Sequence, residues 1–152
     1  MTYKNMYNIS LTLHVLAAAI WAGGHLVLAI GFLPKALKDK DPEVIKFFES
    51  RYERIGIPAL LVLVITGFFQ AFRMVPNFFD WFDYSSFIPI NITIKLSLLI
   101  LTFILAVHAR IWIIPNLNEN NLKPLAYHIT AITVIAVLMV IVGVSFRFGG
   151  LF

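Results

Sequence analysis

The stretch from Leu11 to Leu33, LTLHVLAAAIWAGGHLVLAIGFL, limits the possible folds more than any other part of the chain. It is apolar except for two histidines, and a helix needs about 20 mostly apolar residues to cross a bilayer. The composition agrees, since 60% of the 152 residues are hydrophobic and only 13% are charged. Soluble domains have about a quarter of their residues charged. The sequence therefore predicts an integral membrane protein.

Three further apolar segments follow the first span, at about residues 55–72, 91–114 and 125–146. With the first, at about 11–33, they predict an all-α, four-helix transmembrane bundle that forms a single domain over residues 1–152. We expect the short loops to give a closed bundle. The second span is preceded by EVIKFFESRYERIG, which reads as an amphipathic helix with Asp41 as its N-cap and Pro42 at its first position.

Four spans place both termini on one side of the membrane, here side A, and the loops after the first and third spans on side B. Side A has four basic residues: Lys4, Arg73, Lys95 and Arg147. Side B has eight: Lys35, Lys38, Lys40, Lys46, Arg51, Arg54, Arg110 and Lys123. The excess predicts that side B is cytoplasmic, with both termini on the periplasmic side of a bacterial inner membrane.

The net charge of +4 is thus explained by the loops, and no soluble basic face is left for a nucleic acid. The expected surroundings are the lipid bilayer, and a homo-oligomer is left open. The first span is too long for the apolar core of a cleaved signal peptide. The chain has no cysteine, which excludes disulfides, iron–sulfur clusters, thiolate zinc sites and covalently attached haem.

The two histidines of the first span, His14 and His25, are eleven residues apart. On an α-helix they therefore lie on one stripe, about 16 Å apart along the axis. Ala18 and Trp21 fall between them, and small residues keep this part of the helix thin. Polar residues at this depth are costly and usually functional. A thin stripe that carries histidines suits a flat cofactor lying against the helix.

The other spans add Lys95 near the start of the third, His108 near its end and His128 in the first turns of the fourth. Helix direction places His14 and Lys95 toward side A, and the other three histidines toward side B. Two of the side B imidazoles can then bind one metal axially, with His25 as the first choice. His14 is left with Lys95 or an open coordination position opposite it, which favours substrate or oxygen chemistry with Lys95 as proton donor.

Each of these residues also has a purely structural interpretation. His128 is close enough to the membrane edge to be an interfacial residue, Lys95 can extend to the surface, and Trp21 can be core packing. Arg51 and Arg54 either anchor the membrane edge or pair with haem propionates, since Arg suits carboxylates. The aromatic loop MVPNFFDWFDYSSFIPIN fits the membrane interface or a quinone site.

Imidazole binds iron, copper and zinc alike, so the type of metal depends on the other ligands. A copper site would normally add soft ligands, but the four methionines do not cluster in the sequence: Met1, Met6, Met74 and Met139. We therefore expect non-covalent haem b. Two haems, at His14 and at His25 with Trp21 between them, would let electrons cross the membrane. The alternative is one haem on His14, with copper or nothing at the side B histidines.

The run HVLAAAIWAGGHLVLAIGFLPKAL resembles the first span of the copper-resistance D (CopD) family. It is also similar to that of the HemJ-type protoporphyrinogen oxidases. RYERIGIPALLVLVITGFF resembles their second span, and IKLSLLILTFILAVHARI their third. In the HemJ-type enzymes the first-span His ligates haem b and the third-span Lys is required, which by resemblance assigns these roles to His14 and Lys95. The additional His25 and His128, the GGH motif and the terminal SFRFGG are more CopD-like.

Together these features predict a membrane-embedded b-type haem protein that mediates electron transfer or oxidoreductase chemistry, with quinol, quinone or another small redox substrate. The alternatives are a copper-binding or copper-transport protein of the CopD type and a protoporphyrinogen oxidase-like enzyme with one haem. The sequence does not decide between an enzyme and a carrier.

Overall fold

The computed structural model describes residues 3–150, and within that range the chain is helical, with no strand. A helical rod at the N-terminus consists of α1 (Tyr3–Val27), the π-helical segment η1 (Leu28–Phe32) and α2 (Leu33–Asp39). The rest of the chain forms α3 (Glu43–Met74), the 3-10 helix η2 (Phe78–Phe82), α4 (Phe87–His108), the π-helical η3 (Ala109–Ile113), the 3-10 helix η4 (Ile114–Asn116) and α5 (Leu122–Ser145).

Four of these helical stretches are long and apolar enough to cross a membrane, with 36, 32, 30 and 24 residues. The predicted all-α architecture with four spans is confirmed. The first three helices extend beyond the predicted bounds, because the sequence pattern marks only their apolar parts. The amphipathic segment and the second span form one continuous helix, α3. Its start is capped as expected, since the N–H of Glu43 donates to the Asp41 carboxylate at 2.9 Å.

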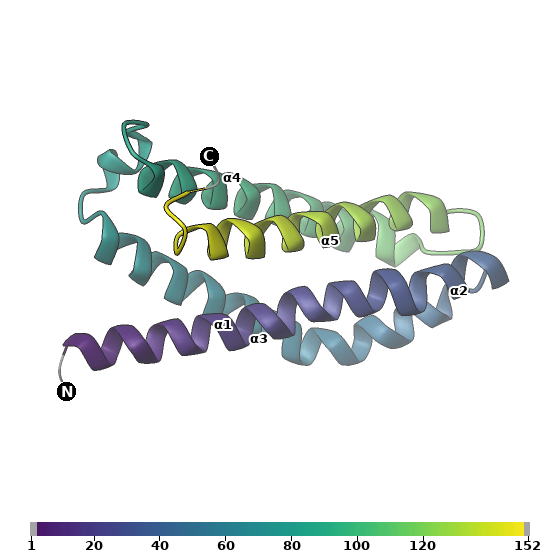
Figure 1. Cartoon of the computed structure of the whole chain (residues 1–152). Coiled ribbons are helices and arrows are strands. Elements are labelled where there is room, and N and C mark those ends of the chain that lie inside the picture. Colours follow the sequence, from purple (N-terminus) through teal and green to yellow (C-terminus); the bar gives the residue numbers. More distant parts are fainter. Residues whose placement is uncertain (1–2, 151–152) are drawn as a thin grey trace.

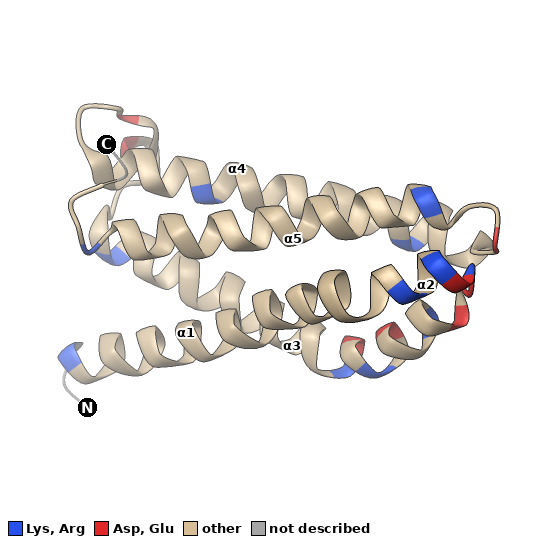
Figure 2. Cartoon of the chain, turned by 45° about the vertical axis from the view of Figure 1, so that its right-hand side comes forward, with Lys and Arg blue, Asp and Glu red and all other residues tan. Residues whose placement is uncertain are grey.

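The four long helices alternate in direction, so that α1 begins and α5 ends at the same end of the molecule (Figure 1). This end corresponds to side A. The connections from α2 to α3 and from η4 to α5 lie at the other end, side B. Most Lys and Arg residues gather toward side B, on α2, the first turns of α3 and the facing ends of α4 and α5 (Figure 2).

The helices are not packed as a closed ring. α1 packs against α3 and α5, and α5 packs against α4, whereas α3 and α4 are not a closely packed pair. The expectation of a closed bundle was wrong, because the ring is open between α3 and α4. At side A, α3 and α4 are held apart by Trp81 of η2. This residue is only 1% exposed, and it packs against Phe72 of α3 and Ile92 of α4. Its indole donates to the carbonyl of Val75 at 2.8 Å, so the aromatic loop is a packed wedge.

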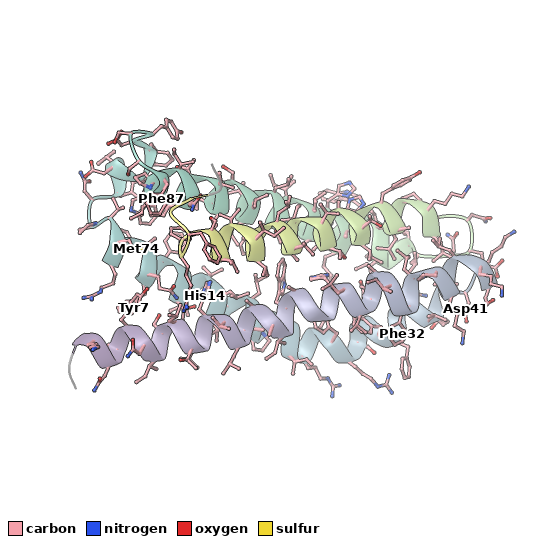
Figure 3. The ribbon with its side chains drawn as sticks, viewed as in Figure 1. Tyr7, His14, Phe32, Asp41, Met74 and Phe87 are labelled. Carbon is pink, nitrogen blue, oxygen red and sulfur yellow. The ribbon has the colours of Figure 1, made fainter. Side chains whose placement is uncertain are left out.

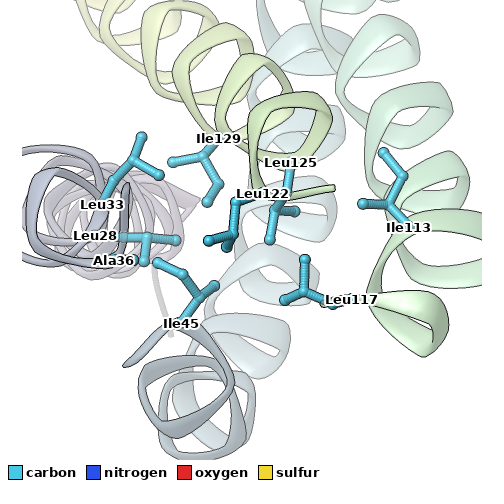
Figure 4. Packing of buried hydrophobic residues seen from close by; sticks show 9 residues of the cluster. All are labelled: Leu28, Leu33, Ala36, Ile45, Ile113, Leu117, Leu122, Leu125 and Ile129. Atoms are coloured by element: carbon cyan, nitrogen blue, oxygen red, sulfur yellow. The ribbon is translucent and has the colours of Figure 1, made fainter. Parts of the chain in front are cut away.

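The hydrophobic core has three parts along the membrane normal. The side B part joins η1, α2, α3, η3 and α5 with the residue after η4 (Figure 4): its members are Leu28, Leu33, Ala36, Ile45, Ile113, Leu117, Leu122, Leu125 and Ile129. The middle part is rich in alanine: Ala17, Trp21, Ala22, Ala59, Ile132 and Ala136. Small side chains here allow α1 to approach α3 and α5 closely.

Candidate functional site

The side A half of the molecule holds a polar site built around His14 of α1. Figure 3 shows where His14 lies along α1. Its Nδ1 lies 2.8 Å from the hydroxyl oxygen of Thr66 on α3. The single hydroxyl proton of Thr66 is directed to the carbonyl of Val62 at 2.5 Å. The Thr66 oxygen must therefore accept from His14, which assigns the imidazole proton to Nδ1. The Nε2 atom of His14 keeps a free lone pair and can bind a metal.

Lys95 of α4 is half-buried and points toward α5 instead of the membrane surface. A Cβ atom added at Gly143 would lie 3.3 Å from its Nζ, and the ring centroid of Phe146 is 5.9 Å from Nζ. α5, which Lys95 faces, also packs against α1, the helix that carries His14. On α3, a Cβ added at Gly67 would lie 3.4 Å from the Cε1 atom of His14. Glycines thus leave room beside both polar side chains.

A second polar layer lies one helical turn nearer side A. On each of three helices a polar residue lies four positions nearer side A than a residue named above: Ser10 of α1, Gln70 of α3 and Asn91 of α4. The Asn91 amide donates to the Ser145 hydroxyl at 2.9 Å, and both side chains are buried. The hydroxyl of Ser10 and the amide nitrogen of Gln70 are also buried, but neither has a hydrogen-bond partner within residues 3–150.

His25 occupies a separate aromatic setting. Its ring meets Trp21 edge-on, with centroids 4.8 Å apart, and meets Tyr52 of α3 edge-on at 5.8 Å. Its Nδ1 is buried and makes no hydrogen bond to the part of the chain that the structure describes. The Tyr52 hydroxyl donates to the carbonyl of Trp21 at 2.9 Å. Trp21 is therefore a core residue that also contacts His25. Its contact with a haem stays a prediction.

His108 and His128 are hydrogen-bonded to each other across α4 and α5. The Nδ1 of His108 lies 2.9 Å from the Nε2 of His128, and the rings are nearly parallel, at 10°. The other nitrogen of His128, Nδ1, lies 2.9 Å from the carbonyl of Pro124, which can only accept. His128 thus carries its proton on Nδ1 and accepts from His108. Only Nε2 of His108 keeps a free lone pair, and stacked rings in direct contact do not lie on opposite faces of one iron.

The two arginines proposed for haem propionates are exposed on α3. The guanidinium of Arg51 lies 3.6 Å from the ring centroid of Phe47, one turn earlier on the same helix. Arg54 lines an outer groove of about 320 Å³ between α1 and α3, whose other lining residues are apolar. Neither guanidinium lies beside His14 or His25 in the contacts that the structure records, and their positions fit anchoring at the membrane edge.

These histidines offer single free nitrogen atoms and not a cluster of ligands. No three or more His, Asp or Glu side chains within residues 3–150 are grouped to hold a metal. A haem brings four nitrogen ligands of its own and needs one or two from the protein. A ligating His normally donates its other N–H to a fixed acceptor, as His14 does to Thr66.

Sequence analysis named His14 and Lys95, and it did not name Thr66, Gln70 or Ser10. A signal for the first two was present, because Thr66 and Gln70 are four residues apart in an otherwise apolar stretch of α3. Side chains with this spacing share one face of a helix. Tyr52 was also missed, because its contact with Gly24 depends on how α1 and α3 cross.

A family model described as "Copper resistance protein D" matches residues 47–146, about two thirds of the chain. The matched segment includes Thr66, Lys95, His108 and His128, whereas His14 and His25 precede it. No curated protein matches the chain, and no solved structure matches it either.

Proposed function

Because the chain belongs to the copper resistance protein D (CopD) family, whose match covers three of its four membrane-crossing helices, we propose that it is a membrane-embedded b-type haem protein that transfers electrons. The proposed axial ligand is Nε2 of His14. The observation that carries the proposal is the His14–Thr66 hydrogen bond, which fixes the tautomer and leaves Nε2 free. The similarity to the HemJ-type oxidases, which also points to His14 and Lys95, stays a prediction.

Each residue around His14 has a role that follows from its contacts. Thr66 holds the imidazole in one orientation and raises its basicity as a ligand. Gly67 and Gly143 leave space beside His14 and Lys95. Lys95 is the proposed proton donor, because its half-buried ammonium group points toward α5, the helix that packs against α1. A bound haem would supply one-electron chemistry at this position.

A second haem at His25 is the extended form of the proposal. His14 and His25 lie on the same uninterrupted helix, α1, about 16 Å apart along its axis. Support comes from this shared stripe alone, because the buried Nδ1 of His25 lacks an acceptor within residues 3–150 of the kind that Thr66 gives His14. His108 and His128 are already bonded to each other, so we do not assign them as the axial pair.

The test is to measure haem and metal content of the protein purified without added cofactor. We expect a red protein with a b-type spectrum. A haem-to-protein ratio near one that is lost in His14→Ala and kept in His25→Ala supports a single site. A ratio near two that falls to one in either variant supports two sites. His128→Ala is the matched control, and full haem content in His14→Ala would overturn the proposal.

A copper-binding function is the second candidate, and the description of the matching family favours it. The lone pairs available to copper are those of His25, of Nε2 in His14 and of Nε2 in His108. Stoichiometric copper without haem in the same measurement would establish this alternative. If haem is present, turnover of a quinol or a porphyrinogen separates an enzyme from a carrier.

We further propose that the protein lies in a bacterial inner membrane with side B in the cytoplasm, because Lys and Arg residues are in excess on side B.

A further inference from the structure

We propose that the side A half of the molecule contains a hydrated vestibule between α1 and α3, which brings water and protons to His14 and Lys95. The starting observation is a pair of buried polar atoms, the Ser10 hydroxyl and the Gln70 amide nitrogen. Neither has a hydrogen-bond partner among residues 3–150. Nothing in the haem proposal requires these two residues.

The helix register places the two side chains opposite each other. Ser10 precedes His14 by four residues on α1, and Gln70 follows Thr66 by four residues on α3. Residues four apart share a helix face. α1 and α3 are antiparallel and are joined at His14 and Thr66, so one turn toward side A brings Ser10 and Gln70 to the same level. They form the first polar step between the membrane surface and His14.

The energetics require a partner for these atoms. A buried polar group without a hydrogen bond costs about 1–3 kcal/mol, and lipid offers no compensation. Residues 3–150 supply no partner, and in this proposal the partner is water that enters from side A. A buried water needs two to four polar partners, which these side chains and the underlying His14–Thr66 pair can supply.

The same polar level continues on the other two helices. Asn91 precedes Lys95 by four residues on α4, and its amide donates to Ser145 of α5. The hydroxyl of Ser145 donates onward to the carbonyl of Val142 at 2.8 Å. Each helix thus carries a polar side chain at this level, and His14 and Lys95 lie directly beneath. A proton that enters at side A can reach both groups through water and hydroxyls.

This inference deepens the proposed function, since a redox site that exchanges protons needs a route for them. Its test is independent of haem. The chain has no cysteine, so single-cysteine variants need no altered background. A thiol reacts as the thiolate, which forms only in contact with water. We would place Ser10→Cys and Gln70→Cys in vesicles and add a charged, membrane-impermeant methanethiosulfonate from side A.

The control for Ser10→Cys is Ile9→Cys, and the control for Gln70→Cys is Phe72→Cys. Ile9 is 46% exposed and Phe72 is 45% exposed, with one side of the Phe72 ring against Trp81, and each lies nearer side A than its test residue. A thiol deeper in the membrane reacts more slowly with a reagent added from side A. A faster reaction of the deeper test residues therefore cannot be explained by their position along the helix. We expect both test variants to react at least about tenfold faster than their controls.

Equal or slower reaction of both test variants, in protein that elutes as a single species on gel filtration, would overturn the vestibule. If one variant does not fold, the other decides the result alone. Fast labelling in a protein without haem would overturn the haem proposal and keep the vestibule. Slow labelling in a protein that binds haem would overturn the vestibule and keep the haem proposal.

Discussion

The Nδ1 of His14 and the hydroxyl of Thr66 are joined by a 2.8 Å hydrogen bond that connects α1 to α3 across the side A half of the molecule. Thr66 cannot donate back, because its proton is directed to the carbonyl of Val62. The bond therefore has one direction, and the free lone pair of His14 is always on Nε2. A hydroxyl on a neighbouring helix thus decides which nitrogen of the imidazole can act as a ligand.

Replacing Thr66 by valine keeps the side-chain shape and removes the acceptor. Loss of such an outer hydrogen bond typically costs 10–100-fold in metal affinity, and we expect haem affinity to fall by about that factor. Haem transfer to an apo-globin acceptor measures it. Thr102→Val is the matched control, since Thr102 is also buried and its hydroxyl donates to the carbonyl of Leu98. Equal losses in the two variants would contradict a specific role for Thr66.

Gly24 and Gly23 are neighbours that should respond differently to alanine. A Cβ at Gly24 would overlap the ring of Tyr52, which is held in place by its bond to Trp21 and by Gly56 behind it. We expect Gly24→Ala to lower the free energy of unfolding by about 1–3 kcal/mol. A Cβ at Gly23 meets no atom within 4 Å, so Gly23→Ala should be neutral or stabilising by up to about 1 kcal/mol. Thermal unfolding in detergent measures both, and equal destabilisation would contradict the close contact.

Lys40 ends α2 in the left-handed conformation, with φ at 53°. This conformation is strained for residues with a side chain, and glycine adopts it freely. We expect Lys40→Gly to raise stability by about 0.5–1 kcal/mol. The control is Lys38→Gly, which removes the same charge inside α2 and should lower stability by up to about 1 kcal/mol. A stability loss in Lys40→Gly, measured by the same melting assay, would count against this assignment.

Reporters fused at Lys40 and after Phe152 should lie on opposite sides of the membrane. The reason is that α5 ends at one end of the molecule, whereas the loop after α2 lies at the other end (Figure 1). The basic excess at side B predicts that the Lys40 fusion is cytoplasmic. Alkaline phosphatase and fluorescent-protein fusions at both positions provide the measurement. Two reporters on the same side would refute the four-span topology.

The spans and the His14–His25 stripe could be predicted because both depend on local periodicity. A long apolar run becomes a helix in lipid, where its backbone groups must bond internally. Eleven residues of unbroken helix then fix the two histidines relative to each other, and α1 is unbroken over this range. Asp41 and Glu43 likewise form a local cap that needs no information from the rest of the fold.

The remaining relationships depend on how helices rotate and pack, which one sequence does not state. The direct bond between His108 and His128 requires α4 and α5 to face each other at one angle. The separation of α3 from α4 depends on Trp81, which entered the core although its loop reads as interfacial. Thr66 became important only because α1 presents His14 to it.

The π turn of η1 sets the rotational phase of the first rod. Leu28 and Leu33 are five residues apart and both are buried. On an ideal α-helix that spacing turns the second residue about 140° away from the first. The wider turn absorbs one extra residue and returns Leu33 and Ala36 to the same core as Leu28. The rod thus has two registers, one for the histidine stripe and one for the side B core. Deleting a single residue from η1 would merge them into one α-helical register, with Leu33 four residues after Leu28 and α2 still facing the core.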